Sequence, residues 1–192
     1  RSVVRVLHEH GESATLHEMF YRKDADRVEI RHGVSIRADG SVAHLRDTAV
    51  QEEAVYAELP RYDTVSRRRF ALPEGKPGTV LDTATVQTRE GVLPQYWYTE
   101  QFLFGSYDPG RELEVAVVVP DGCTLRWQIR NDPDGTVAHR TVRVNGATRH
   151  EWRRLDIPQL LPEPMMPPLA DLVPRLDVSA YPGSWEQAAN EL

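Results

Sequence analysis

Short segments in which apolar and polar residues alternate dominate this sequence, and their period of two restricts the possible folds more than any other feature. The segment 123–129, CTLRWQI, has polar residues on one face. Its other face carries Cys123, Leu125, Trp127 and Ile129. The segment 113–119, LEVAVVV, also alternates, but both of its faces are partly apolar, which is typical of a central strand. A turn at 120–122, PDG, joins the two segments, so we expect an antiparallel pair.

Two turn signals predict β-hairpins. Asn145-Gly146 lies between TVRV and ATRHEW, and Asp39-Gly40 lies between VSIR and SVAHL. Both pairs can adopt the positive φ angles of a type I′ turn, whose twist matches that of the flanking strands. We therefore expect each pair to connect two neighbouring antiparallel strands.

Further segments bring the expected number of short strands to about ten. They are 3–9, 13–21, 27–30, 80–88 and 95–104. Strands this numerous need two sheets packed face to face, or a closed barrel, to bury their apolar faces. We predict an all-β fold, an antiparallel two-sheet β-sandwich over residues 1–157.

Composition excludes several classes of partner. Lys and Arg total 23 against 29 Asp and Glu, so the net charge is −6 and phosphate backbones would be repelled. We expect no nucleic-acid partner. No apolar run is long enough for a membrane span, and Arg1 does not begin a signal sequence. Because the sequence also lacks an initiator methionine, we expect it to be part of a longer protein.

The C-terminal part has a different composition. Seven prolines fall within 25 residues, and they are Pro158, Pro162, Pro164, Pro167, Pro168, Pro174 and Pro182. Proline cannot donate to a β-ladder, so residues 158–183 are expected to run as an extended, proline-rich strap. Its leucines and methionines should be buried on the sandwich. Ser184 and Gln187 then form a capping-box pattern, which predicts a short helix start over 184–192 leading to a downstream domain.

Several motifs carry a resemblance to a known family. They include Pro162-Glu163-Pro164, Met166-Pro167-Pro168, Asp171 and Ser184-Trp185-Glu186. This ending resembles that of the uncharacterised domain, a domain of unknown function, that precedes transglutaminase-like domains in bacterial proteins. The segments VVRVLHEHGESA, RVEIRHGVSIRADGSV and 77–131 resemble the earlier strands of that family, so the similarity covers nearly the whole chain. After Glu186, Ala188-Ala189-Asn190 stands where the family has a helix with an aromatic pair.

The resemblance implies a non-catalytic accessory role. The Cys, His and Asp of a transglutaminase-like domain, a papain-like thiol enzyme, would lie beyond Leu192. The chain would then not be an enzyme by itself, and it would pack on the downstream domain in the same parent chain or present substrate to it. The family also implies a periplasmic or cell-envelope setting, whereas the single cysteine is compatible with cytoplasm or periplasm.

Candidate chemistry in the sequence is sparse. Cys123 alternates with apolar residues, which indicates a small buried side chain and not a thiol nucleophile. If residues 12–13 formed a tight hairpin, His8 would face His17 and His10 would lie nearby, a workable spacing for zinc. Scattered histidines on an exposed strand are the simpler interpretation. No phosphate loop, nucleophile elbow or HExxH helix occurs, so we expect no cofactor.

Two further groups of residues could bind ligands. The aromatic run 96–107 could form a stacking platform for a sugar or peptide, with Trp97 and Tyr107 as contacts, although one face of the run most simply fills the core. Arg67-Arg68-Arg69 could bind an anion, but such a run is usually a solvated edge that discourages aggregation. Two alternatives therefore remain beside the accessory domain: an independent carbohydrate- or peptide-binding module, and a stand-alone hydrolase.

Overall fold

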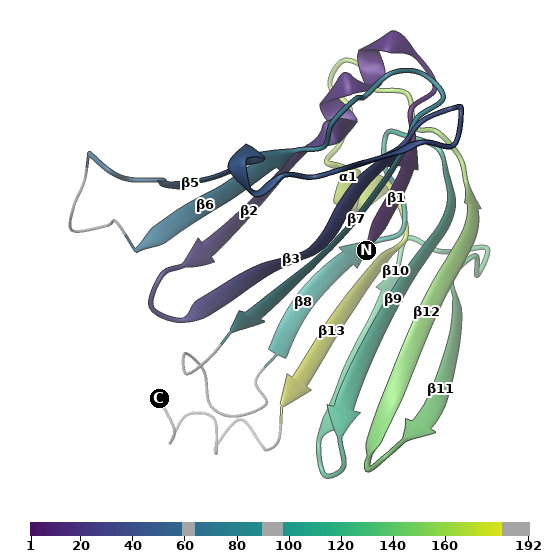
Figure 1. The fold of residues 1–192 in the computed structure, drawn as a ribbon. Helices are drawn as coiled ribbons and strands as arrows, with labels where there is room; N and C mark the ends of the chain where they lie inside the picture. Colours follow the sequence, from purple (N-terminus) through teal and green to yellow (C-terminus); the bar gives the residue numbers. More distant parts are fainter. Residues whose placement is uncertain (59–63, 90–97, 182–192) are drawn as a thin grey trace. The chain divides into compact units, whose positions relative to one another are not determined.

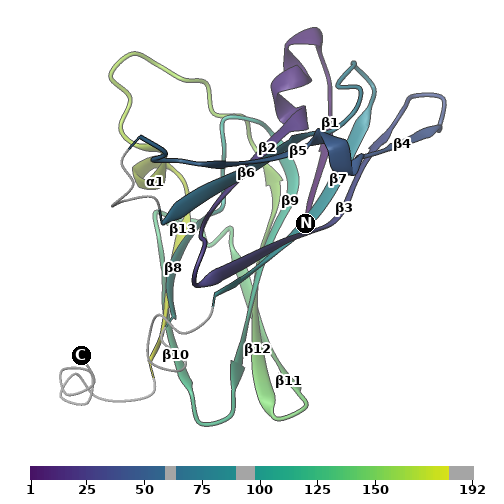
Figure 2. The ribbon, with the colours of Figure 1, turned by 60° about the vertical axis from the view of Figure 1, so that its left-hand side comes forward.

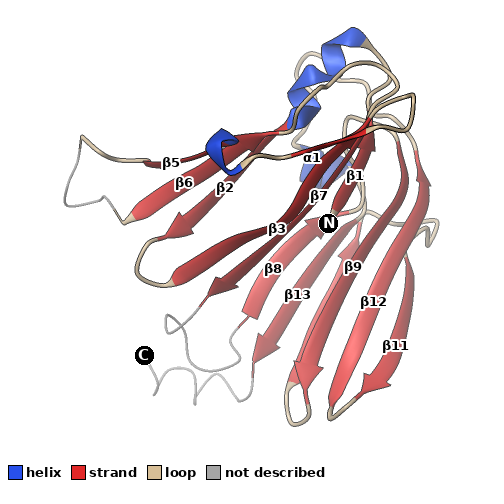
Figure 3. Ribbon diagram, in the orientation of Figure 1, coloured by secondary structure: helices blue, strands red, loops and turns tan. Residues whose placement is uncertain are grey.

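The computed structural model describes residues 1–58, 64–89 and 98–181, which are mainly β-strands in antiparallel sheets (Figure 3). The all-β prediction is confirmed. The chain divides into two compact units, Arg1–Val92 and Leu93–Leu192, whereas we expected one sandwich over 1–157. Each unit contains two antiparallel sheets of its own.

The first unit contains a four-stranded and a three-stranded sheet (Figure 1). The four-stranded sheet has the order β1 (Ser2–Arg5), β7 (Val80–Arg89), β3 (Asp26–Ile36) and β4 (Val42–His44). The other has the order β2 (Leu16–Arg22), β6 (Val65–Ala71) and β5 (Val50–Ala54). Two 3₁₀ helices, η1 (Glu9–Thr15) and η2 (Asp47–Ala49), connect strands. The core contains Val6, Phe70, Leu72 and Leu81.

The second unit has two three-stranded sheets that form separate layers (Figure 2). One has the order β10 (Thr124–Arg130), β13 (Arg175–Tyr181) and β8 (Tyr98–Leu103). The other has the order β11 (Ala138–Val144), β12 (Ala147–Ile157) and β9 (Gly110–Pro120). Phe104, Val137, Trp152, Leu176 and Val178 form the buried core of this unit.

The predicted pairing of 113–119 with 123–129 is wrong. Strand β9 pairs with β12, and β10 pairs with β13, so the turn at Pro120–Gly122 passes from one sheet to the other. Strand β9 is also an edge strand and not a central one, and Val118 on its outer face is 53% exposed. Alternation reveals which side chains share a face, but it does not identify the partner strand.

The strap prediction fails over part of its length. Residues 158–174 contain only the short helix α1 (Leu169–Leu172), and within them Leu161 and Met165 are exposed while Val173 is buried. Residues 175–181, in contrast, form β13, the central strand of its sheet. Pro174 precedes this strand, and residues 175–181 contain no proline, so every ladder donor remains available. The helix start predicted at 184–192 lies outside the described residues.

Both predicted hairpins form. Asn145 and Gly146 connect β11 to β12 with φ angles of 39° and 77°, as the type I′ turn requires. Between β3 and β4, only Gly40 has a positive φ, and the Arg37 amide donates to the Ser41 carbonyl oxygen. None of the helices in the described ranges is long and apolar enough to cross a membrane.

Candidate functional site

Four rings gather in the second unit, where the edge strands β10 and β11 belong to opposite layers. Trp127 comes from β10, His139 from β11, and His150 and Trp152 from β12. The register of the hairpin places His139 opposite Trp152 and His150 opposite Thr141. Both histidines therefore lie on the same face of their sheet as the core residue Trp152. We call these four side chains the His–Trp cluster.

The rings of the His–Trp cluster are in close contact. The centroid of His139 lies 4.5 Å from that of Trp127 and 4.8 Å from that of Trp152. The Trp127 indole meets Trp152 edge to face at 5.6 Å. Such tilted and stacked arrangements are the favoured geometries of aromatic pairs. Trp152 is fully buried, whereas Trp127 is 40% exposed, so the cluster runs from the core to the surface.

The two histidines face each other through ring nitrogens. Nδ1 of His150 lies 3.4 Å from Nε2 of His139, and the ring planes are 12° apart. Burial lowers the pKa of both imidazoles, and the charge that His150 would carry lowers the pKa of His139 further. Both rings are therefore neutral at pH 7, and each has one nitrogen lone pair for a hydrogen bond or a metal ion.

A hollow lies on the face of this sheet that is opposite to the rings of the His–Trp cluster. It has a volume of about 220 Å³ and is lined by Glu114, Ala138, His139, Arg140, Glu151 and Arg153. Glu151 is buried and accepts hydrogen bonds from Arg140 and Arg149, which lower the pKa of its carboxyl group. Ala138 lies opposite Arg153, and Arg153 pairs with Glu112 at 2.6 Å. The small side chain of Ala138 leaves room on a face that is otherwise covered by ion pairs.

One polar atom of the cluster lacks a partner. The indole Nε1 of Trp152 is buried and makes no hydrogen bond among the described residues. An unpaired buried donor usually destabilises a fold by about 1–3 kcal/mol. The packing of Trp152 against its neighbours must offset this loss.

The histidine cluster predicted near the N-terminus does not form as expected. Residues 9–15 form η1 instead of a tight hairpin, and β1 and β2 belong to different sheets, so His8 does not face His17 across a ladder. His17 instead stacks on Phe70 at 5.0 Å, and burial lowers its pKa. His10 lies in η1. Across 1–58, 64–89 and 98–181, no three His, Cys, Asp or Glu residues gather in a group that could hold a metal ion.

The predicted aromatic platform is only partly visible. Trp97 lies outside the described residues. Tyr107 is 44% exposed in the loop between β8 and β9. Phe102 and Phe104 belong to the core of the second unit, in agreement with the expectation that one face of this run fills the interior.

Cys123 is half-buried in the turn just before β10. Its amide donates to the Pro120 carbonyl oxygen at 3.2 Å. No hydrogen bond joins its thiol to a histidine in the described part of the chain. This position is compatible with the structural role expected from the sequence.

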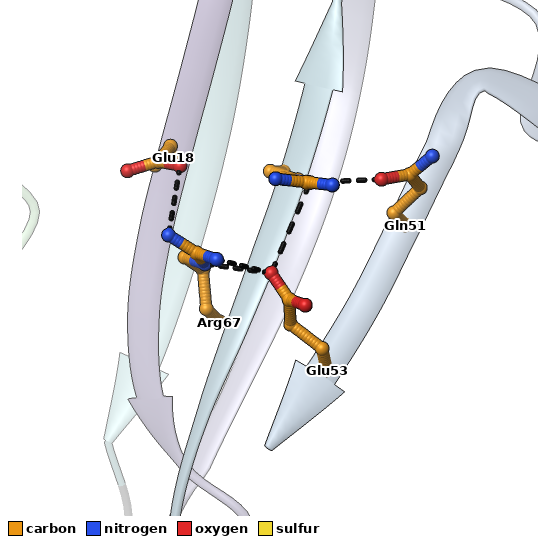
Figure 4. A network of polar contacts seen from close by, with 5 residues as sticks. Glu18, Gln51, Glu53 and Arg67 are labelled. Carbon is orange, nitrogen blue, oxygen red and sulfur yellow. Dashed lines mark hydrogen bonds and ion pairs between the residues drawn. The ribbon is translucent and has the colours of Figure 1, made fainter. Parts of the chain in front are cut away.

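The arginine run lies on a central strand and not on a sheet edge. Arg67 pairs with Glu53 on one neighbouring strand and with Glu18 on the other, and Arg69 donates to Gln51 at 2.8 Å (Figure 4). Arg68 points to the opposite face, where it donates to the Val28 carbonyl oxygen at 2.6 Å. It also lies over the Tyr21 ring and pairs with Glu52. The run therefore stabilises sheets and offers little charge to a free anion.

The His–Trp cluster was missed at the sequence level, although a signal for it was present. Asn145-Gly146 fixes Val144 opposite Ala147, and counting outward places His139 opposite Trp152 and diagonal to His150. The remaining residue of the cluster, Trp127, comes from another sheet. No local pattern predicts that contact.

Comparisons with known proteins agree with the fold. A family model described as a domain of unknown function with a solved structure, DUF3857, matches residues 1–160. No curated protein matches the sequence. A crystal structure from Parabacteroides distasonis ATCC 8503, described as "a putative protease", superposes with a TM-score of 0.77 at 20% identity. The similarity covers 88% of this chain and 33% of that one, so this chain spans about a third of the length of that protein.

Proposed function

This chain belongs to the DUF3857 family, and we propose that it is a non-catalytic accessory domain of a larger bacterial protein with a transglutaminase-like thiol domain. In this role it packs on the downstream domain or presents a peptide substrate to it. The periplasm or cell envelope is the compartment that we propose for the parent protein.

The observation that carries this proposal is the partial coverage of the similar structure. A fold like this one takes up 33% of a chain described as "a putative protease", which leaves most of that chain for other domains. The motifs Pro162-Glu163-Pro164 and Met166-Pro167-Pro168 add support, because they resemble the ending of domains that precede transglutaminase-like domains.

The position of Cys123 is also in keeping with an accessory role. A thiol nucleophile needs a base within hydrogen-bond reach that draws its proton away. Within residues 98–181, His139 and His150 are not paired with the Cys123 thiol. They instead pair with one another, and both rings pack on Trp152. The proposal therefore assigns the cysteine to the fold and any thiol chemistry to another domain.

Peptidase and transamidation assays on the isolated chain test this proposal. The wild-type chain and Cys123→Ser are incubated with fluorescent casein and with an amine donor. We expect neither protein to cleave or label casein. We also expect Cys123→Ser in the complete parent protein to leave its activity unchanged. Turnover by the isolated chain that disappears in Cys123→Ser would refute the accessory role.

The exposed indole of Trp127 favours a second candidate, a module that binds carbohydrate or peptide. Trp127 is 40% exposed and packs on His139, and exposed aromatic rings stack on sugars and peptides. Fluorescence titration with peptidoglycan fragments tests this candidate. A response in the wild type that is lost in Trp127→Ala and kept in Tyr107→Ala would support it.

A further inference from the structure

The distance between the facing nitrogens of His139 and His150 suits a bound metal ion. Nε2 of His139 and Nδ1 of His150 are 3.4 Å apart. Imidazole nitrogens bind Zn²⁺ at about 2.0–2.1 Å in tetrahedral geometry, which separates two such ligands by about 3.4 Å. A metal ion could therefore bridge these atoms once each ring turns its lone pair from the facing nitrogen toward the ion.

Both rings are held by the fold, so few conformations are lost when an ion binds. They come from β11 and β12, whose register the turn at Asn145-Gly146 fixes. Each ring also stacks on Trp152, at 4.8 Å for His139 and 5.8 Å for His150. Side chains fixed by packing in this way form more precise metal sites than side chains on loops.

The protonation state of the pair also favours binding. A metal ion requires the neutral imidazole, and burial lowers the pKa of both histidines. Without metal, the two nitrogens share one proton in a hydrogen bond. Binding moves that proton to an outer ring nitrogen, Nδ1 of His139 or Nε2 of His150, and both inner lone pairs become ligands.

We propose that His139 Nε2 and His150 Nδ1 bind a late first-row divalent metal ion, Zn²⁺ or Cu²⁺, at the edge of the second unit. Imidazole is a favourable ligand for both ions, and Cu²⁺ is bound more tightly than Zn²⁺ by most nitrogen sites. Two protein ligands leave at least two positions of a tetrahedral ion for water or for a donor group from another molecule. The site would thus hold an exchangeable ion.

Tryptophan fluorescence can report on this site, because two indoles lie against the ligand rings. Cu²⁺ is titrated into the 192-residue chain, and Zn²⁺ and EDTA are then added to separate samples. We expect saturable quenching at one ion per chain, reversal by EDTA and competition by Zn²⁺. Quenching that does not saturate would contradict the proposal.

Variants locate the ligands. His139→Gln and His150→Gln should each weaken Cu²⁺ binding by at least about tenfold, since even the hydrogen-bond partners of metal ligands often contribute that much. His44→Gln, which changes an exposed histidine of β4, should bind like the wild type. Binding that survives in both cluster variants but is lost in His10→Gln would place the ion at the N-terminal histidines and overturn the proposal.

A measurement on the unmodified chain guards against misfolded variants. In nitrogen-15 NMR spectra, Zn²⁺ should shift the ring nitrogens of two histidines, which the variants assign as His139 and His150. Electron paramagnetic resonance of the Cu²⁺ complex should show coupling to two imidazole nitrogens. Shifts of other histidines alone, with these two rings unchanged, would refute the site.

Discussion

The His139 imidazole lies on the buried indole of Trp152, with ring centroids 4.8 Å apart and ring planes 22° apart. This contact joins a half-exposed residue of an edge strand to the center of the core of the second unit. The same indole contacts Trp127 and His150. Trp152 therefore supports both the packing of the two layers and the geometry of the His–Trp cluster.

Replacing Trp152 with alanine should destabilise the second unit by about 3–5 kcal/mol, the usual loss for a large buried aromatic residue. Trp127→Ala should cost less, because that side chain is 40% exposed. All four tryptophans lie in the second unit, so fluorescence during urea unfolding follows this unit. Equal losses for the two variants would show that Trp152 is not the central contact.

Arg68 should contribute more to stability than its neighbour Arg67. Arg68→Met leaves the Val28 carbonyl oxygen without its donor and Glu52 without its cation, so we expect a loss of about 1–3 kcal/mol. Arg67→Met removes only ion pairs on the outer face, which should cost less than about 1 kcal/mol. Circular dichroism during urea unfolding measures both losses. A larger loss for Arg67→Met would contradict the assignment of faces.

Asp82 should make the first unit sensitive to acid. Hydrogen bonds from Arg1 and His32 lower the pKa of its carboxyl group to about 2. The pKa in the unfolded chain is about 3.9, so ionised Asp82 stabilises the fold. This contribution is nearly complete above about pH 5 and is lost as the pH falls toward 2.

The test is the melting temperature of the wild type and of Asp82→Asn between pH 5 and pH 2. The difference between the two proteins should shrink as the pH falls. His32→Gln should have a smaller effect, because the hydrogen bond from Arg1 is the larger cause of the shift. Parallel curves for the wild type and Asp82→Asn would show that the carboxyl group titrates normally.

The alternating pattern predicted faces better than it predicted partners. It placed Leu125 and Ile129 on an inward face, and both pack against the core of the second unit. It paired 113–119 with 123–129 because a turn joins them, yet these strands enter different sheets. The sheet that each of these two strands joins depends on its pairing partner, β12 or β13. Both partners follow later in the sequence, so no local feature determines the pairing.

The prediction for the candidate site was limited in the same way. His8 and His17 were considered because they are close in sequence, but η1 separates their strands. His139 and His150 flank a hairpin turn that the sequence does predict, so their proximity could have been derived from it. The contact with Trp127 could not, since it depends on the packing of two sheets.

Residues beyond the family match should be essential for the second unit. The match ends at residue 160, whereas β13 lies between β10 and β8 and is the only described partner of each. A chain ending at residue 160 also lacks the buried Leu176 and Val178. We expect this shorter chain to keep a folded first unit and to lose the second.

Two-dimensional NMR of chains ending at residues 160 and 181 provides the measurement. The longer chain should show dispersed signals for Trp127 and Trp152, because its β13 is complete. The shorter chain should show indole signals typical of unfolded protein, together with dispersed signals from β3 and β7, whose pairing does not involve β13. Dispersed indole signals in the shorter chain would mean that β10 and β8 can form a stable sheet without β13. The order β10-β13-β8 would then not be required for folding, contrary to the expectation that burial of Leu176 and Val178 holds this layer against the other.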